Sequence, residues 1–367
     1  MEPAPRRAEP APCADGPPNY VAGMGDIEGI AAKPVTAWFE ANIQGAVGPL
    51  EFDLIAGGRS NLTFRVTDAA GARFVLRRPP TSHVLPTAHD MGREHRIIKA
   101  LGPTPVPVPP ALGFCDDEVV NGAPFYVMGY VEGHVLRDAQ VVERVFTAAQ
   151  RRTAAEDLID VLADLHQVDV DAVGLGELAR REAYIERQLK RWYGQYKQSA
   201  EMQGRSVPVI EEMHEVLAAR VPEQHGATIV HGDYRLDNTM FDDRARVAAV
   251  LDWEICTLGD PLADVGLLMV YWPEPGEQSA LGVAPTAADG FPTRAELKAR
   301  YAARSGRDLS GLDFYVSFGY WKLACILEGV FARYAGGAMG GDRSGYESFG
   351  EQVRLLGEAS REAAGRL

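Results

Sequence analysis

Apolar and polar residues alternate along the first third of the chain in a pattern that is typical of half-buried strands. Residues 62–67 switch between apolar and polar side chains at every position, which predicts a strand. The turn at 68–71 and the apolar run at 74–76 predict that a second strand returns beside the first as a hairpin. A second hairpin is expected over residues 119–128, with an Asn-Gly pair as its turn.

The spacing of apolar residues changes to a helical period farther along the chain. Residues 92–101 predict a helix that ends at a Gly-Pro pair, and the proline-rich run 103–110 predicts an extended connection. Apolar residues then recur three and four positions apart over residues 158–165 and 185–196, which predicts two helices with core-facing stripes. The change from strand to helix patterning predicts a boundary between two lobes at residues 130–135.

These elements predict an α+β chain of two lobes. With 367 residues, of which 46% are hydrophobic and 24% charged, the composition is that of a folded globular protein. We expect a flexible tail over residues 1–24, a small β-rich lobe over 25–131 and a larger, mainly helical lobe over 132–367. The tail is rich in Ala, Pro and charged residues and has no apolar segment of the kind that a secretory signal needs.

The net charge and the cysteines limit the kinds of partner and the cellular compartment that we expect. The net charge is −14, so the chain lacks the basic face that neutralises nucleic-acid phosphates, and we expect no nucleic-acid partner. The most apolar stretch, residues 262–272, contains Asp264 and is far shorter than the roughly 20 residues that span a bilayer, so no membrane insertion is expected. Four widely spaced cysteines form no C-x-x-C pair, which favours reduced thiols and a cytoplasmic location.

The candidate chemistry is concentrated in residues 229–254, which read IVHGDYRLDNTMFDDRARVAAVLDWE. Asp233 lies in a loop, Asn238 follows five residues later, and Asp252 ends the next apolar strand. Phosphoryl transfer needs a group that orients and deprotonates the attacking hydroxyl, and oxygen ligands for the Mg²⁺ that bridges the phosphates. A loop Asp supplies the first, and an Asn amide oxygen with a strand-end carboxylate supplies the second. Protein kinases have the same order of catalytic Asp, Asn and metal-binding Asp.

Three segments of this region resemble one known family. HGDYRLDN, VLDWE and GDPLAD are similar to the motifs of the aminoglycoside phosphotransferase and choline kinase superfamily, and the resemblance spans roughly residues 35–340. Within it, the chain resembles a subgroup of phosphotransferase-like domains, some of them fused to acyl-CoA dehydrogenases. The resemblance implies a protein-kinase-like bilobal fold and a transfer of the γ-phosphoryl group of ATP, with Mg²⁺, to a hydroxyl of a small molecule.

The resemblance also implies roles for single residues of the large lobe. Asp233 would be the catalytic base, and Asn238 and Asp252 would hold Mg²⁺. His231 would support the catalytic loop through hydrogen bonds.

The implied nucleotide site lies between the lobes. The cation of the third strand would be Arg77, paired with Glu94 on the small-lobe helix. Met128 and Tyr130 would bound the hinge, where backbone groups meet adenine. A turn between the first two strands would cover the phosphates; its residues are Gly57, Gly58, Arg59, Ser60 and Asn61.

One position departs from the kinase pattern. Kinases place a Lys on the third strand, where this chain has Arg77, and the planar guanidinium is a different phosphate ligand from an ammonium group. Its neighbour Arg78 is expected on the other face of the strand, because successive side chains alternate. Arg77 leaves open a second interpretation, in which the protein is a non-catalytic pseudokinase that binds nucleotide.

The identity of the acceptor is also left open. A hydroxyl of an unknown metabolite, such as a hydroxylated acyl compound, is the first hypothesis. An aminoglycoside is the second, because a polycation suits an acidic chain. The choice between ATP and GTP, the oligomeric state and the closure of residues 273–292 over substrate stay open as well.

Four further polar residues are predicted to support the site. Asp260 precedes a proline and is expected to cap a helix. Asp264 is expected to bind backbone N–H groups of the catalytic loop, and His166 is expected to be structural. Glu254 is equally compatible with support of the metal-binding Asp and with a solvated loop.

Overall fold

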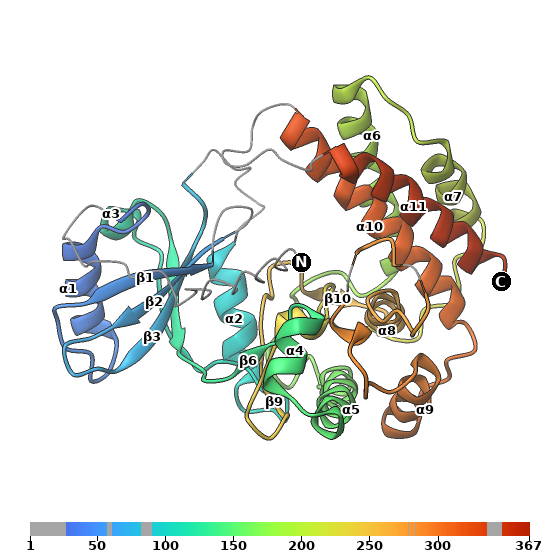
Figure 1. The fold of residues 1–367 in the computed structure, drawn as a ribbon. Helices are drawn as coiled ribbons and strands as arrows, with labels where there is room; N and C mark the ends of the chain where they lie inside the picture. The colour runs from blue at the N-terminus through green and yellow to red at the C-terminus, as the bar shows by residue number, and fades with distance from the viewer. Residues whose placement is uncertain (1–26, 57–60, 82–89, 278, 283, 336–346) are drawn as a thin grey trace, which may run out of the picture.

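The computed structural model describes residues 27–56, 61–81, 90–277, 279–282, 284–335 and 347–367. Figure 1 shows a small lobe built on a sheet and a larger lobe built mainly of helices, which confirms the predicted α+β, bilobal architecture. The tail predicted over residues 1–24 lies outside the described residues.

The small lobe is a five-stranded antiparallel sheet with the strand order β1-β2-β3-β5-β4. Its strands are β1 (Glu51–Ala56), β2 (Leu62–Thr67), β3 (Arg73–Arg78), β4 (Ala111–Cys115) and β5 (Phe125–Gly129). Its helices are α1 (Ala32–Asn42), α2 (Met91–Leu101) and α3 (Glu118–Asn121). The first predicted hairpin is present as β2 and β3, which pair along their full length.

The alternation along β3 explains how the sheet is buried on both faces. Phe74 packs with Phe39 of α1, whereas Val75 packs in a second cluster with Ile97 of α2. Because successive side chains of a strand point to opposite faces, one strand serves both cores. The same alternation places Arg77 on the face of Val75, where the two lobes meet.

The second predicted hairpin does not form, and the prediction was wrong at this point. Residues Glu118–Asn121 form the short helix α3, and β5 pairs with β4 instead. Asp117 accepts a hydrogen bond from the Val119 N–H at 2.9 Å, which caps the start of this helix. Gly122 ends it at φ 71°, a left-handed conformation that glycine adopts without strain. The Asn-Gly pair therefore ends a helical turn.

The large lobe consists of helices that surround two small sheets, β6-β8-β9 and β7-β10. Its strands are β6 (His134–Val135), β7 (Thr228–Val230), β8 (Thr239–Phe241), β9 (Val247–Val250) and β10 (Thr257–Gly259). Its helices are α4 (Ala139–Val145), α5 (Ala148–Leu165), α6 (Tyr184–Gln203), α7 (Pro208–Ala218), α8 (Leu262–Val270), α9 (Arg294–Ser305), α10 (Leu312–Ala335) and α11 (Glu347–Ala364), with short 3-10 turns at η1 (Leu236–Asn238) and η2 (Pro285–Ala287). Among the described helices, none combines the length and the apolar composition that crossing a membrane requires.

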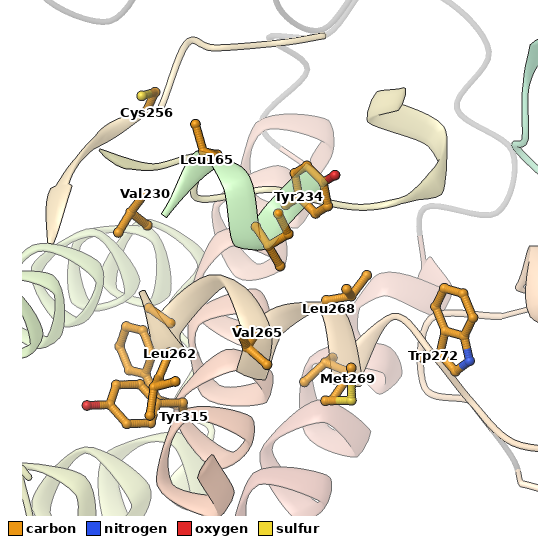
Figure 2. Packing of buried hydrophobic residues seen from close by; sticks show 14 of the residues in the cluster. Leu165, Val230, Tyr234, Cys256, Leu262, Val265, Leu268, Met269, Trp272 and Tyr315 are labelled. Atoms are coloured by element: carbon orange, nitrogen blue, oxygen red, sulfur yellow. The ribbon is translucent and has the colours of Figure 1, made fainter. Parts of the chain in front are cut away.

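Helix α8 lies at the centre of the large lobe, and all nine of its residues are buried. Figure 2 shows Leu262 and Leu268 of this helix among apolar side chains from other elements, including Tyr315 of α10. A β-carbon at Gly266 would lie 2.5 Å from the backbone of Tyr315, so glycine is required for the close approach of α8 and α10. The buried helix also carries Asp264, which lies beneath the predicted catalytic loop.

Candidate active site

The predicted catalytic loop starts where β7 ends, and a buried aspartate of α8 fixes its backbone. Asp264 accepts hydrogen bonds from the backbone N–H groups of His231 at 2.7 Å and Gly232 at 2.8 Å. The expected contact between Asp264 and this loop is therefore confirmed. The His231 ring is buried and lies 2.9 Å from the Leu251 carbonyl oxygen, which fits a supporting role.

Asp264 is itself held by a buried hydrogen-bond chain. His166 Nε2 lies 3.3 Å from its carboxylate, and Nδ1 of the same ring lies 2.7 Å from the Tyr301 hydroxyl. Burial alone would raise the pKa of Asp264, but the hydrogen bonds from His166 and the loop N–H groups outweigh it and bring the pKa below its usual value. His166 is structural, as predicted. Asp260 also has its predicted capping role, because it accepts a hydrogen bond from the Leu262 N–H at 2.9 Å.

Three side chains hold the carboxylate of Asp233. The Asn238 amide nitrogen donates a hydrogen bond to Oδ2 at 2.8 Å, and the Tyr271 hydroxyl donates one to Oδ1 at 3.1 Å. Arg235 Nε lies 3.3 Å from Oδ2 as an ion pair. The Asp233 side chain remains 27% exposed, so it is oriented by these partners and still open to an incoming group.

Arg235 and Tyr271 were not predicted from the sequence. The Arg235 guanidinium lies over the Tyr271 ring, 4.8 Å from its centroid, and forms ion pairs with Asp233 and Asp237. Burial alone would lower the pKa of Arg235, but these carboxylates raise it, so the guanidinium is charged. A signal for Arg235 was available, since it lies inside the motif two residues after Asp233. Tyr271 comes 38 residues after Asp233, and nothing local marks it.

A second cluster of charges lies where the two lobes meet. Arg77 forms ion pairs with Glu94 at 3.3 Å, with Asp252 at 2.6 Å and with Glu254 at 3.7 Å. The expected pairing of Arg77 with Glu94 is therefore confirmed, and Glu254 belongs to the cluster rather than to a solvated loop. The Asn61 amide donates a hydrogen bond to Glu94 at 2.9 Å.

Some of the other residues predicted for the small lobe are described by the structure, and others are not. Arg78 lies on the opposite face from Arg77, as predicted, and donates a hydrogen bond to the Asn121 carbonyl oxygen at 3.0 Å. Of the predicted phosphate-covering turn, Asn61 is described and buried. The remaining members lie outside the described residues; they are Gly57, Gly58, Arg59 and Ser60.

A cavity of about 280 Å³ lies between the two lobes next to this cluster. Apolar side chains from both lobes line it, namely Ile55, Val75, Met128, Met240 and Val250. Its polar wall contains the predicted residues Arg77, Asn238 and Asp252, and the predicted hinge residues Met128 and Tyr130 also line it. Such an apolar slot with a few converging polar groups is typical of a binding site for a small molecule.

The polar end of the cavity fits a divalent cation. The Asn238 amide nitrogen donates to the main-chain and side-chain oxygens of Asp233, both at 2.8 Å, which leaves the amide oxygen for another partner. Asp252 contributes a carboxylate to the same wall. Three carboxylates, those of Glu94, Asp252 and Glu254, surround the single guanidinium of Arg77, so the cluster carries excess negative charge. Asn238 and Asp252 are therefore suitable oxygen ligands for Mg²⁺.

Glu94 makes the stability of the protein depend on pH. Burial raises the pKa of Glu94 from 4.5 to about 7, against the attraction of Arg77, and repulsion from Asp252 and Glu254 adds to the rise. Because the folded chain holds this proton more tightly than the unfolded chain, the free energy of unfolding falls as the pH rises from 4.5 to 7. We expect Glu94→Gln to flatten this fall, as measured by melting temperature across this window without nucleotide or Mg²⁺.

The matched control for this prediction is Glu132→Gln, at an exposed position of the chain. Its melting temperature should follow pH in the same way as that of the wild type. Equal pH dependence in Glu94→Gln and the wild type would show that another group titrates in this range.

Comparison with known proteins places these residues in a family. A model of the phosphotransferase enzyme family matches residues 51–314. The chain is also 36% identical over 298 residues to acyl-CoA dehydrogenase family member 10 of Mus musculus, a match that covers 78% of this chain and 27% of that protein. The chain thus spans about a quarter of the length of this curated relative.

Solved structures of similar fold agree with the family match. A candidate aminoglycoside phosphotransferase from Ralstonia eutropha JMP134 is 34% identical, with a TM-score of 0.76 over 91% of this chain and 98% of that chain. The ADP-bound aminoglycoside phosphotransferase APH(2″)-Ib is 15% identical, with a TM-score of 0.57 over 91% of this chain and 99% of that chain, and shows the fold alone. Arg77, Asp233, Asn238 and Asp252 lie within the matched range, residues 51–314. The chain belongs to the phosphotransferase enzyme family.

Proposed function

We propose that the protein transfers the γ-phosphoryl group of ATP to a hydroxyl group of a small molecule. The observation that carries this proposal is the hydrogen bond between the Asn238 amide and the Asp233 carboxylate. The amide nitrogen of Asn238 bonds the loop carboxylate, while the same side chain lines the cavity that Arg77 and Asp252 share. The proposed base, Asp233, therefore lies next to Arg77 and Asp252, which are suited to bind the phosphates and their metal ion. The family match supports a small-molecule phosphotransferase.

The interlobe cavity is the proposed nucleotide site. Its apolar walls suit a purine base, and its Arg77 end suits the phosphates. A protein of the same fold binds ADP, which supports a nucleotide in this chain too. Asn238 and Asp252 would hold Mg²⁺ through their side-chain oxygens, and the bound ion would supply positive charge that offsets the charge developing on the phosphates.

Asp233 acts on the acceptor in the proposed reaction. It accepts a hydrogen bond from the acceptor hydroxyl and takes its proton as the hydroxyl oxygen attacks the γ-phosphorus. The bond between the γ-phosphorus and the bridging oxygen breaks, and ADP leaves with the electron pair. The acceptor becomes a phosphate monoester. Arg77 and Arg235 place fixed positive charge beside the cavity and beside Asp233, where charge develops.

Tyr271 is a positioning residue for Asp233, and removing its hydroxyl should slow turnover. Tyr271→Phe keeps the ring beneath Arg235 and deletes the hydrogen bond to Asp233 Oδ1. We expect kcat to fall about tenfold, the scale of one hydrogen bond to a charged group, while KM for the nucleotide stays unchanged. Steady-state kinetics with saturating acceptor measures both constants.

The control for this prediction is Tyr315→Phe. The Tyr315 side chain is buried, and its hydroxyl likewise donates one hydrogen bond to an aspartate, Asp260, at 2.8 Å. This variant should lose stability and keep kcat. A similar fall of kcat in both variants would mean that Tyr271 acts only through the stability of the fold.

One observation favours a second candidate function, a pseudokinase that binds nucleotide without turnover. Arg77 Nη2 lies 2.6 Å from Asp252 Oδ1 and occupies an oxygen that the proposed metal site needs. If the protein is an enzyme, the contact between Arg77 and Asp252 must break when Mg²⁺ and nucleotide bind. If the protein is a pseudokinase, the same contact must persist.

ADP formation from ATP separates the two functions. The assay combines the protein, Mg²⁺ and ATP or GTP with hydroxy acids, their coenzyme A esters and aminoglycosides, and calorimetry measures nucleotide binding in parallel. We expect ADP formation that depends on Mg²⁺ and on an acceptor, with a metabolite hydroxyl as the first candidate and an aminoglycoside as the alternative. Nucleotide binding without ADP formation for any acceptor would favour the pseudokinase. Absence of binding would contradict both.

A further inference from the structure

Two cations contact the ring of one tryptophan beside the catalytic loop. Lys322 of α10 lies 5.6 Å from the centroid of the Trp192 ring, and the Arg191 guanidinium lies 4.8 Å from it. Lys322 Nζ also donates a hydrogen bond to the Gly232 carbonyl oxygen at 2.7 Å, directly before Asp233 in the chain. Figure 1 shows α6 and α10, which carry these residues, packed together in the large lobe.

A third cation, Arg93 of the small lobe, lies near Arg191. Arg93 of α2 donates a hydrogen bond to the Cys256 carbonyl oxygen at 2.7 Å, in the segment that follows Asp252. Partial desolvation by its neighbours lowers the pKa of Arg191, whose side chain is otherwise exposed, and repulsion from Arg93 lowers it further. Burial likewise lowers the pKa of Lys322, to which repulsion from Arg191 also contributes. Arg191 is therefore close enough to Arg93 and to Lys322 to be repelled by both. We call Arg93, Arg191 and Lys322 the basic cluster.

The basic cluster has no carboxylate partner within the described residues. Arg93 and Lys322 bond neutral carbonyl oxygens, although Asp233 and Asp264 attract Lys322 from a distance. Arg191 is exposed, and within the described ranges it forms neither an ion pair nor a hydrogen bond. This arrangement contrasts with that of Arg77, Arg235 and Arg300, each of which forms an ion pair with a carboxylate. Positive charge is thus concentrated beside the catalytic loop and left without a counter-ion.

We propose that the basic cluster is a subsite for an anionic group of the acceptor, a carboxylate or a phosphate. Arg191 contacts this group directly, and the buried Lys322 adds positive charge and fixes the Gly232 backbone. The inference rests on the proposed function, because it names the acceptor class of that same site. It favours an anionic hydroxyl compound and disfavours a polycation such as an aminoglycoside, since like charges at short range repel.

The basic cluster serves the acceptor rather than the nucleotide. The interlobe cavity is lined by Arg77, Asn238 and Asp252, and no member of the basic cluster lines it. Lys322 instead reaches the catalytic loop from α10, in the interior of the large lobe. An acceptor that presents its hydroxyl to Asp233 can therefore place an anionic group near Arg191 while the nucleotide occupies the cavity.

A set of ligands that differ in charge tests this subsite. The ligands are hydroxyoctanoates that differ in hydroxyl position, their methyl esters, their coenzyme A thioesters and kanamycin. Calorimetry measures their dissociation constants with Mg²⁺ and a non-hydrolysable ATP analogue present. We expect an acid or its thioester to bind about tenfold more tightly than the matching methyl ester, the scale of one charge-assisted hydrogen bond. The comparison of acid with thioester tells whether carboxylate or phosphate is recognised.

Arg191→Gln should abolish this preference and leave binding of the methyl ester unchanged. Lys190→Gln is the matched control, because it removes the same charge at the adjacent, exposed position of α6. It should keep the preference for the anion. The proposed subsite would be overturned if both variants had equal effects or if acid and ester bound equally well. It would also be overturned if kanamycin bound preferentially or if no anion bound. Arg191-dependent binding without phosphoryl transfer would support the subsite and contradict the proposed function.

Discussion

Replacing Asp233 by asparagine should lower the rate of phosphoryl transfer by a factor of about 100 to 10,000, the range that general base catalysis contributes. The variant keeps the shape of the side chain and an oxygen for the Asn238 amide, but it cannot take the proton of the acceptor. Because Asp233 does not line the interlobe cavity, affinity for ATP should stay close to that of the wild type. Rates of ADP formation and calorimetric titration with ATP measure the two effects.

The control for this variant is Asp243→Asn. Asp243 lies farther along the same chain segment, its side chain is 95% exposed, and its carboxylate pairs with His134. It should retain full turnover. Undiminished turnover of Asp233→Asn would show that another group accepts the proton.

Asp252→Asn should remove the dependence of ATP binding on Mg²⁺. The carboxylate of Asp252 lines the cavity, and an amide is a weaker, neutral ligand for a hard cation. We expect the gain in ATP affinity on adding Mg²⁺ to fall by about tenfold or more, since even residues that only support metal ligands have effects of this size. Turnover should fall with it. Titration with ATP at increasing Mg²⁺ concentration gives the affinity.

The two aspartate variants are each other's control. Asp233→Asn should lose turnover and keep Mg²⁺-dependent binding, whereas Asp252→Asn should lose both. Unchanged Mg²⁺ dependence in Asp252→Asn would remove Asp252 from the metal site. The role of this carboxylate would then be limited to its ion pair with Arg77.

The central part of the site could be predicted because its residues are close in sequence. Asp233 and Asn238 are five residues apart and are joined by two hydrogen bonds, and a short hairpin brings Asp252 back beside them. The link between Asp264 and the loop could also be predicted, since a buried aspartate near the start of a helix needs N–H partners.

The partners that come from distant elements could not be predicted. Tyr271 reaches Asp233 only because α8 runs beneath the loop, and Lys322 reaches Gly232 from α10. Arg191 lies on a helix whose apolar stripe was evident, but the direction of its exposed face depends on how α6 packs on α10. The role of Glu254 likewise depended on the contact between the lobes, which brings it to Arg77.

The wrong hairpin has a local physical reason. An Asn-Gly pair permits left-handed backbone both in a hairpin turn and at the end of a helix. Asp117 supplied a helix start three residues before Val120, and β5 already had a partner in β4. The same dipeptide therefore had two compatible structures, and pairing between strands decided between them.

Phosphorus NMR of the wild-type protein with ATP, Mg²⁺ and a hydroxylated acceptor tests the proposed phosphoryl transfer, because it follows the transferred phosphorus itself. We expect that the γ-phosphate signal of ATP declines while the signal of a phosphate monoester grows, and that Asp233→Asn suppresses both changes. An ATP spectrum that stays constant with every acceptor class, or an ester that forms equally fast with Asp233→Asn, would contradict it.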